Sequence, residues 1–84
     1  MYRLAVYPEA RDQIAALPDE LLPVYLQVLD MLELTPWNGE PYNASNPEGA
    51  MRQLAFGPDG RGIVIYLMLE EQRSVDILRV QWFS

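Results

Sequence analysis

The chain has 84 residues, half of them hydrophobic, and contains no cysteine, histidine or lysine. This length and composition predict one small domain over residues 1–84 and exclude both a disulfide framework and the usual zinc ligands, so we expect no metal and no cofactor. The net charge of −6 lies in residues 1–48, while residues 49–84 are neutral, which excludes the broad basic face of a protein that binds nucleic acid through many phosphates.

The first predicted elements are a strand and two helices. Residues 2–7 alternate in polarity and end at Pro8, which is typical of a strand. Pro8 begins a first helix, which ends at Pro18 and has an apolar stripe formed by Ala10, Ile14 and Leu17. Asp19 is expected to cap a second helix, in which leucines recur at helical spacing as far as Leu34. We expect the two helices to form a hairpin that buries one face against a flat surface.

Residues 35–50 form the longest predicted loop, because they are dense in proline, glycine and asparagine. Long loops often carry function, but we favour packing over the core for Trp37. A meander of strands then follows, at residues 51–56, 63–69 and 74–82. The resulting fold class is α+β, with an N-terminal strand and a two-helix hairpin packed on a small antiparallel sheet.

The middle strand of this meander, residues 63–69, is apolar at every position, which is typical of a strand covered on both faces. The helix hairpin can cover one face. The other face needs the 35–50 loop, a partner protein or self-association, so a homodimer stays open. No apolar run reaches the roughly 20 residues of a membrane span, and the N-terminus lacks the features of a signal peptide. We therefore expect a cytoplasmic protein without a membrane partner.

The order of these elements and several short motifs resemble the RelE/ParE toxin superfamily. The motifs are YRLAVYPEARDQI at residues 2–14, LP at 17–18, LTPW at 34–37, the hairpin MRQLAFG…GRGIVIY at 51–66 and VDILRV at 75–80. The resemblance covers nearly the whole chain. It implies a toxin of a bacterial type II toxin–antitoxin system, neutralised by a cognate antitoxin that wraps it with an extended or helical segment. RelE-like members cleave mRNA on the ribosome, and ParE-like members inhibit DNA gyrase.

Three arginines are the candidate catalytic residues for an mRNA interferase. A metal-independent ribonuclease needs a base, an acid and cations at the phosphate, and a guanidinium offers paired donors to phosphate oxygens. Arg52 matches the family's hairpin arginine, Arg61 lies two residues before the position of its catalytic arginine, and Arg79 lies in the last strand. Each has a structural alternative. Arg52 can bond carbonyls of the 35–50 loop or pair with Glu48, Arg61 can be a solvated turn residue, and Arg79 can pair with a neighbouring acid.

The residues that would complete this chemistry are harder to find. The family's last strand usually runs into a basic pair and then a tail with a tyrosine or glutamate, whereas this sequence has Gln81-Trp82. We expect Tyr66 in the core, and Glu70 and Glu71 as solvated turn acids. An apolar groove for an antitoxin is better supported, from the side chains of Leu54, Phe56, residues 63–69, Val80, Trp82 and Phe83.

We therefore expect a growth-inhibiting toxin, acting as a ribosome-dependent mRNA interferase with reduced or rearranged chemistry. Its partners would be the cognate antitoxin and, for the enzyme, the ribosome and mRNA. The alternatives are a non-catalytic toxin-fold protein that blocks a protein target such as DNA gyrase, and an inactive relic that only binds the antitoxin.

Overall fold

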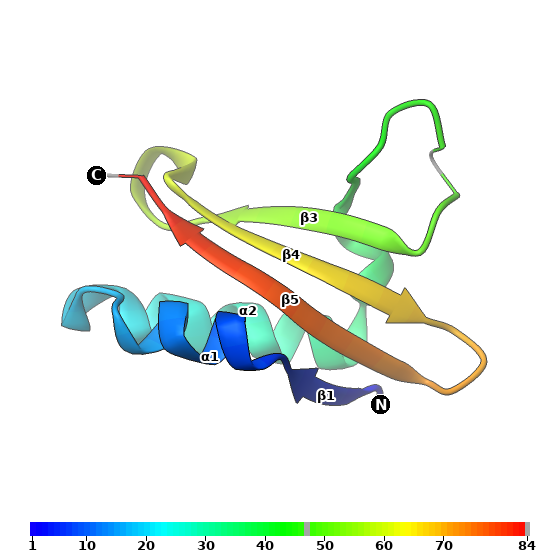
Figure 1. Ribbon diagram of the computed structural model, residues 1–84, viewed down its shortest axis with the longest axis horizontal. Helices are drawn as coiled ribbons and strands as arrows, with labels where there is room; N and C mark the ends of the chain where they lie inside the picture. Colours follow the sequence, from blue (N-terminus) through cyan, green and yellow to red (C-terminus); the bar gives the residue numbers. More distant parts are fainter. Residues whose placement is uncertain (47, 84) are drawn as a thin grey trace.

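The protein has two layers, a five-stranded sheet and a pair of helices across one of its faces (Figure 1). The computed structural model describes residues 1–46 and 48–83. In chain order, β1 (Arg3–Val6) leads into α1 (Pro8–Ala15) and α2 (Leu22–Leu34), which form the predicted hairpin. The meander of β3 (Met51–Phe56), β4 (Gly62–Leu69) and β5 (Ser74–Trp82) follows. The α+β fold class is confirmed.

The sheet is mixed, with the strand order β1-β5-β4-β3-β2. The meander pairs antiparallel, as predicted, and β2 (Glu40–Pro41) adds antiparallel to β3. In contrast, β1 lies parallel to β5, with Arg3 opposite Ser74 and Val6 opposite Ile77. A parallel neighbour requires a long crossover connection, which the helices and the first meander strands supply. The expectation of an antiparallel sheet is thus wrong at one edge.

The start of the second helix also differs from the prediction. Asp19 is the first residue of a short 3-10 helix, η1 (Asp19–Leu21), and α2 begins only after it. Leu21 occupies the N-cap position of α2, where no side chain caps the helix. Pro23 is tolerated in the first turn because the N–H groups there have no partner within the helix. The predicted cap at Asp19 is therefore wrong.

The predicted 35–50 loop is partly regular. Its first residues form a 3-10 helix, η2 (Pro36–Asn38), and the short strand β2 then pairs with β3. Elements of two or three residues are too short to leave a periodic pattern in the sequence. Trp37 packs edge-on against Tyr2, with ring centroids 6.2 Å apart, but its side chain stays half exposed. The packing expected of Trp37 is thus present in part.

The core lies between the helices and the sheet, and it fixes which side chains of each strand face outward. Val64 and Tyr66 of β4 are fully buried in it, together with Leu32 of α2 and with Val75 and Ile77 of β5. The prediction of a core position for Tyr66 is confirmed. Because successive side chains of a strand point to opposite faces, Ile63, Ile65 and Leu67 lie on the face that the helices do not cover. No helix in the described part of the chain is long and apolar enough to cross a membrane.

Candidate functional site

The face of the sheet opposite the helices, here called the open face, is the candidate site. It is formed by alternate residues of the three long strands, except that the register irregularity in β5 adds both Leu78 and Arg79. The residues are Met51, Gln53, Ala55, Ile63, Ile65, Leu67, Asp76, Leu78, Arg79 and Gln81. Strand pairing places them side by side, since Gln53 lies opposite Ile65 and Ile65 opposite Arg79. The face is mainly apolar along its centre. It is also hollowed.

The central hollow of the open face has a volume of about 370 Å³. Its lining combines Met51, Ile65 and Leu78 of the sheet with Tyr7, Glu9, Tyr42 and Arg79. Ile65 is only 9% exposed although it lies outside the main core, because its neighbours on this face cover it. A second hollow of about 350 Å³ lies towards β2 and is lined by Asn38, Glu40, Gln53, Leu54, Ala55 and Ile63. The open face is therefore an apolar strip bordered by a few polar groups.

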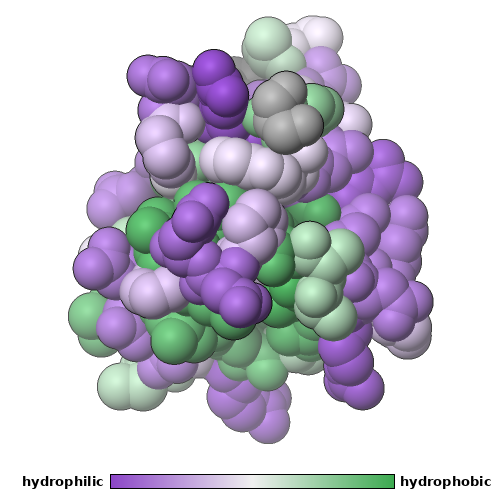
Figure 2. Space-filling view, turned by 90° about the vertical axis from the view of Figure 1, so that its left-hand side faces the viewer, coloured by the Kyte–Doolittle hydropathy of each residue, from purple (hydrophilic) through white to green (hydrophobic). Residues whose placement is uncertain are grey.

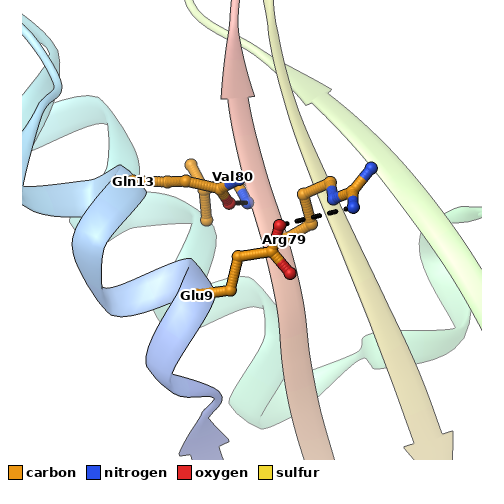
Figure 3. A network of polar contacts seen from close by, with 4 residues as sticks. All are labelled: Glu9, Gln13, Arg79 and Val80. Atoms are coloured by element: carbon orange, nitrogen blue, oxygen red, sulfur yellow. Dashed lines mark hydrogen bonds and ion pairs between the residues drawn. The ribbon is translucent and has the colours of Figure 1, made fainter.

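Arg79 is the candidate arginine that lines the central hollow. Its Nη2 atom lies 3.4 Å from Oε1 of Glu9, and both side chains are about half exposed (Figure 3). An exposed ion pair of this kind contributes at most about 1 kcal/mol, so it holds Arg79 weakly. The alternative that Arg79 pairs with a neighbouring acid is realised in the structure. The carboxylate also offsets the charge that Arg79 would offer to a phosphate.

Helix α1 is fastened to β5 beside this ion pair. One turn after Glu9, the Oε1 atom of Gln13 accepts a hydrogen bond of 2.7 Å from the backbone N–H of Val80 (Figure 3). The contact lies beside an irregularity in the β4–β5 register, where Ile65 pairs with Arg79 but Tyr66 pairs with Ile77. An extra residue at such a bulge leaves backbone groups without their ladder partners. The Gln13 side chain supplies one acceptor there and holds α1, which carries Glu9 of the hollow, against β5.

Arg52 lies on the opposite side of the sheet from Arg79. It pairs in register with Tyr66, whose side chain points into the core, and it is half buried. Its Nη1 atom donates a hydrogen bond of 3.0 Å to the carbonyl oxygen of Gly39. This is the structural alternative for Arg52, in which it bonds a carbonyl of the 35–50 loop.

The Arg52 contact belongs to a compact arrangement that fastens η2 and β2 to the sheet. The Tyr66 hydroxyl donates a hydrogen bond of 2.5 Å to the carbonyl oxygen of Pro36, and burial raises the pKa of Tyr66. A Cβ atom at Gly39 would overlap the Tyr66 hydroxyl, so the close approach requires glycine. This arrangement faces the helices and not the open face.

Arg61 lies at the end of the sheet, immediately after the 3-10 turn η3 (Pro58–Gly60). Its side chain is exposed, and its carbonyl oxygen accepts a hydrogen bond of 2.9 Å from the N–H of Phe83. Ile65 pairs with Arg79 and lies four residues after Arg61, so Arg61 and Arg79 are separated by roughly 13 Å along the strand direction. The structure therefore does not bring Arg52, Arg61 and Arg79 together.

The acidic residues of the turn between β4 and β5 lie away from the central hollow. Glu70 and Glu71 are exposed turn residues, as expected. Oε1 of Glu70 accepts a hydrogen bond of 2.6 Å from the Tyr2 hydroxyl, and this bond raises the pKa of Tyr2. Within the described residues, no group of three histidine, cysteine, aspartate or glutamate side chains could hold a metal ion.

Sequence reasoning missed five side chains of the central hollow, namely Met51, Leu78, Tyr7, Glu9 and Tyr42. It also placed Phe56, Val80 and Trp82 in the apolar groove, and this is wrong, because they pack in or against the core on the helix side of the sheet. Tyr7 and Glu9 flank the proline that ends β1, and Tyr42 follows β2 in the predicted loop. None belongs to a motif that points to chemistry, and only the parallel pairing of β1 with β5 brings the first two beside Arg79. The site can hold an apolar segment against its floor and one polar or charged group at the Glu9–Arg79 pair.

Comparison with solved structures identifies the fold. The chain superposes on the toxin in the crystal structure of the intact E. coli RelBE toxin–antitoxin complex, with a TM-score of 0.80 and 13% sequence identity over 100% of this chain and 99% of that chain. The isolated E. coli RelE toxin gives a TM-score of 0.80 at 12% identity, covering 100% of this chain and 86% of that one.

A further match is the archaeal RelE–RelB complex from Pyrococcus horikoshii OT3, with a TM-score of 0.66 and 19% identity over 96% of this chain and 93% of that one. No family model and no curated protein sequence matches the chain. The fold is therefore that of RelE, as the sequence motifs predict, at identities that establish the fold alone.

Proposed function

We propose that this protein is the toxin of a type II toxin–antitoxin pair and that a segment of its cognate antitoxin covers the open face. The observation that carries the proposal is the RelE fold over the full length of the chain, at a TM-score of 0.80 to a toxin crystallised with its antitoxin. Small monomeric proteins rarely expose a continuous apolar strip without a binding role. Met51, Ile63 and Leu78 of the open face are partly exposed, and they support a protein ligand.

The activity of the free toxin is a separate question, with two candidates. An mRNA interferase would use Arg61 and Arg79 to stabilise the charge that gathers on the phosphate during attack by the 2′-hydroxyl. The second candidate is a non-catalytic toxin that blocks a protein target, in the manner of a gyrase inhibitor. It is favoured by the placement of the arginines, because Arg52 faces the helices and Arg79 is paired with Glu9 at the hollow. We favour this second candidate.

The toxin proposal is tested by inducible expression in bacteria, alone and with the neighbouring reading frame. We expect growth arrest that co-expression of the neighbour relieves, and a stable complex on co-purification. Tyr42→Glu, on the open face, should weaken that complex. Gln72→Glu makes the same charge change in an exposed turn and should leave it intact. Absence of arrest at every expression level, together with absence of a complex, would overturn the proposal.

The two activities are separated by mapping mRNA 5′ ends during arrest. The binding activity predicts no new ends, and equal arrest by the wild type and by the Arg61→Ala/Arg79→Ala variant. New ends that vanish in this variant would instead establish the interferase. An inactive relic would form the complex but never arrest growth.

A further inference from the structure

The outer surface of α2 carries leucines that the fold leaves exposed. Leu22, Leu26 and Leu34 are 37%, 58% and 61% exposed, while the opposite side of the helix buries Tyr25 and Leu32 in the core. With Asp30, the exposed leucines follow one another at intervals of four residues. They form a single ridge, which we call the α2 ridge: Leu22, Leu26, Asp30 and Leu34.

A ridge of this spacing is the feature by which helices pack against one another. Side chains at i, i+4 and i+8 fit the groove between corresponding rows of a second helix. The helix has 13 residues, so the ridge extends over roughly 20 Å, enough to contact a partner helix of several turns. At the end of the molecule where α2 begins, hydrophobic side chains show between hydrophilic ones at the centre and lower left, whereas the top, the right and the bottom are mainly hydrophilic (Figure 2).

The charges that η1 and α2 themselves carry have one sign. Residues 12–51 contain neither arginine nor lysine. Within this stretch, Asp19 and Glu20 lie in η1 at the start of α2, Asp30 lies in the ridge, and Glu33 lies next to Leu34. Every charged group of η1 and α2 is thus a carboxylate. A partner that buries the leucines must bring cations to these carboxylates, since like charges in an interface are unfavourable.

We propose that the α2 ridge is a second protein-binding surface, whose partner is an amphipathic helix with an apolar stripe and with lysine or arginine placed to face Asp30. The ridge belongs to the helical layer and the open face to the far side of the sheet, so the two surfaces lie on opposite sides of the molecule (Figure 1). A second copy of the chain fits poorly, because packing ridge on ridge would bring carboxylates of both copies together. Anionic lipid and nucleic acid fit poorly for the same reason.

The test uses two synthetic peptides of about 18 residues, each with leucines on one helical face and either lysine or glutamate on the other. Binding of the labelled peptides to the full chain is followed by fluorescence anisotropy. We expect the lysine peptide to bind and the glutamate peptide not to bind. Affinity for the lysine peptide should fall as salt is raised from about 50 to about 200 mM, because screening weakens the ion pairs.

Matched variants locate the binding site. Asp30→Lys should weaken binding of the lysine peptide at least tenfold, whereas Glu71→Lys makes the same charge change in an exposed turn and should weaken it less than about threefold. Leu26→Gln should weaken binding by roughly tenfold. Tyr42→Gln, at a residue of similar exposure on the open face, should not. Both leucine and tyrosine are exposed enough for the variants to fold.

Three results would overturn the proposal. Equal losses in Asp30→Lys and Glu71→Lys would show that the peptide responds only to net charge. A loss in Tyr42→Gln but not in Leu26→Gln would place the peptide on the open face. A dimer in sedimentation experiments that Leu26→Gln dissociates would show that the ridge contacts a second copy of the chain. None of these results depends on growth arrest, so the failure of this proposal and of the proposed function are distinguishable.

Discussion

Replacement of Arg52 by methionine separates a structural role of this arginine from a catalytic one. The substitution keeps an unbranched apolar stem and removes the guanidinium, which donates a hydrogen bond of 3.0 Å to the Gly39 carbonyl oxygen. Gly39 is buried, so in the variant its carbonyl oxygen loses a charged donor and water cannot replace that donor. We therefore expect Arg52→Met to destabilise the attachment of η2 and β2 to the sheet.

The size of this effect follows from the contact. A hydrogen bond to a charged group contributes about 1.5–3 kcal/mol, and the half-buried position of Arg52 places the loss near the lower end, at about 2 kcal/mol. For a domain of this size, the melting temperature should fall by roughly 8–16 °C. The free energy of unfolding is measured by urea denaturation followed by circular dichroism. Arg61→Met is the control, since its side chain is exposed and the change should stay within about 0.5 kcal/mol.

The functional arm of this experiment uses temperature. If Arg52 only holds the fold, growth arrest by Arg52→Met should weaken at high temperature and return on cooling, when the variant is folded again. Arg79→Met should show no such dependence, because the pair that it removes is exposed. A variant Arg52→Met with wild-type stability and no growth arrest at any temperature would refute the structural role and return Arg52 to the chemistry.

Three further predictions concern single contacts. Burial raises the pKa of Tyr25 from 10.0 to about 12, so its neutral form contributes stability that is complete below pH 10 and is lost as the pH rises from 10 to 12. The Tyr25 hydroxyl has no partner among the described residues, so Tyr25→Phe should raise the free energy of unfolding by about 1 kcal/mol at pH 7 and flatten the alkaline loss. Both effects are measured by urea denaturation, and a loss of stability at pH 7 would contradict this prediction. Gln13→Leu leaves the Val80 N–H without its acceptor and should cost about 1–3 kcal/mol, with faster hydrogen exchange at Val80, whereas unchanged exchange there would refute the role of Gln13. Glu9→Gln removes the carboxylate beside Arg79, so inorganic phosphate should bind more strongly at that guanidinium, while the free energy of unfolding changes by less than about 1 kcal/mol. Phosphate binding is measured by an NMR titration of the Arg79 side-chain signals. A response equal to that of the wild type would contradict the prediction.

Local patterns in the sequence predict most of the elements of this fold but not their pairing. The last strand begins and ends where alternation places it, at Ser74 and Trp82, and α2 ends at Leu34 as its leucine spacing indicates. The parallel pairing of β1 with β5 joins segments about seventy residues apart, and neither segment's pattern specifies the direction of its neighbour. The missing cap at Asp19 has a different cause, since a 3-10 turn replaces the first helical turn.

The sequence predicts the candidate site less well than the fold. Arg52 has the same alternation phase as Leu54 and Phe56, which the sequence pattern assigns to the antitoxin groove. The structure packs Leu54 and Phe56 against the helices, so Arg52 lies on that face as well. Family resemblance alone makes it a phosphate ligand. Tyr7 and Tyr42, in contrast, reach the central hollow from segments on either side of the helix hairpin, so only the folded sheet brings them together.

Charge decides how the remaining hypotheses are weighed. An enzyme that binds a structured RNA gains its affinity and its encounter rate from an excess of cations, and both decline when the protein is anionic. This protein carries a net charge of −6, and the guanidinium at its central hollow is paired with a carboxylate. Exposed charges are screened beyond roughly 8 Å at physiological ionic strength, so a local cluster of arginines could act despite the net charge. The three candidate arginines form no such cluster, since Arg52 faces the helices and Arg61 lies roughly 13 Å along the sheet from Arg79.

The same carboxylates that repel RNA attract a basic protein surface. Both the apolar open face and the acidic α2 ridge therefore favour protein partners over nucleic acid.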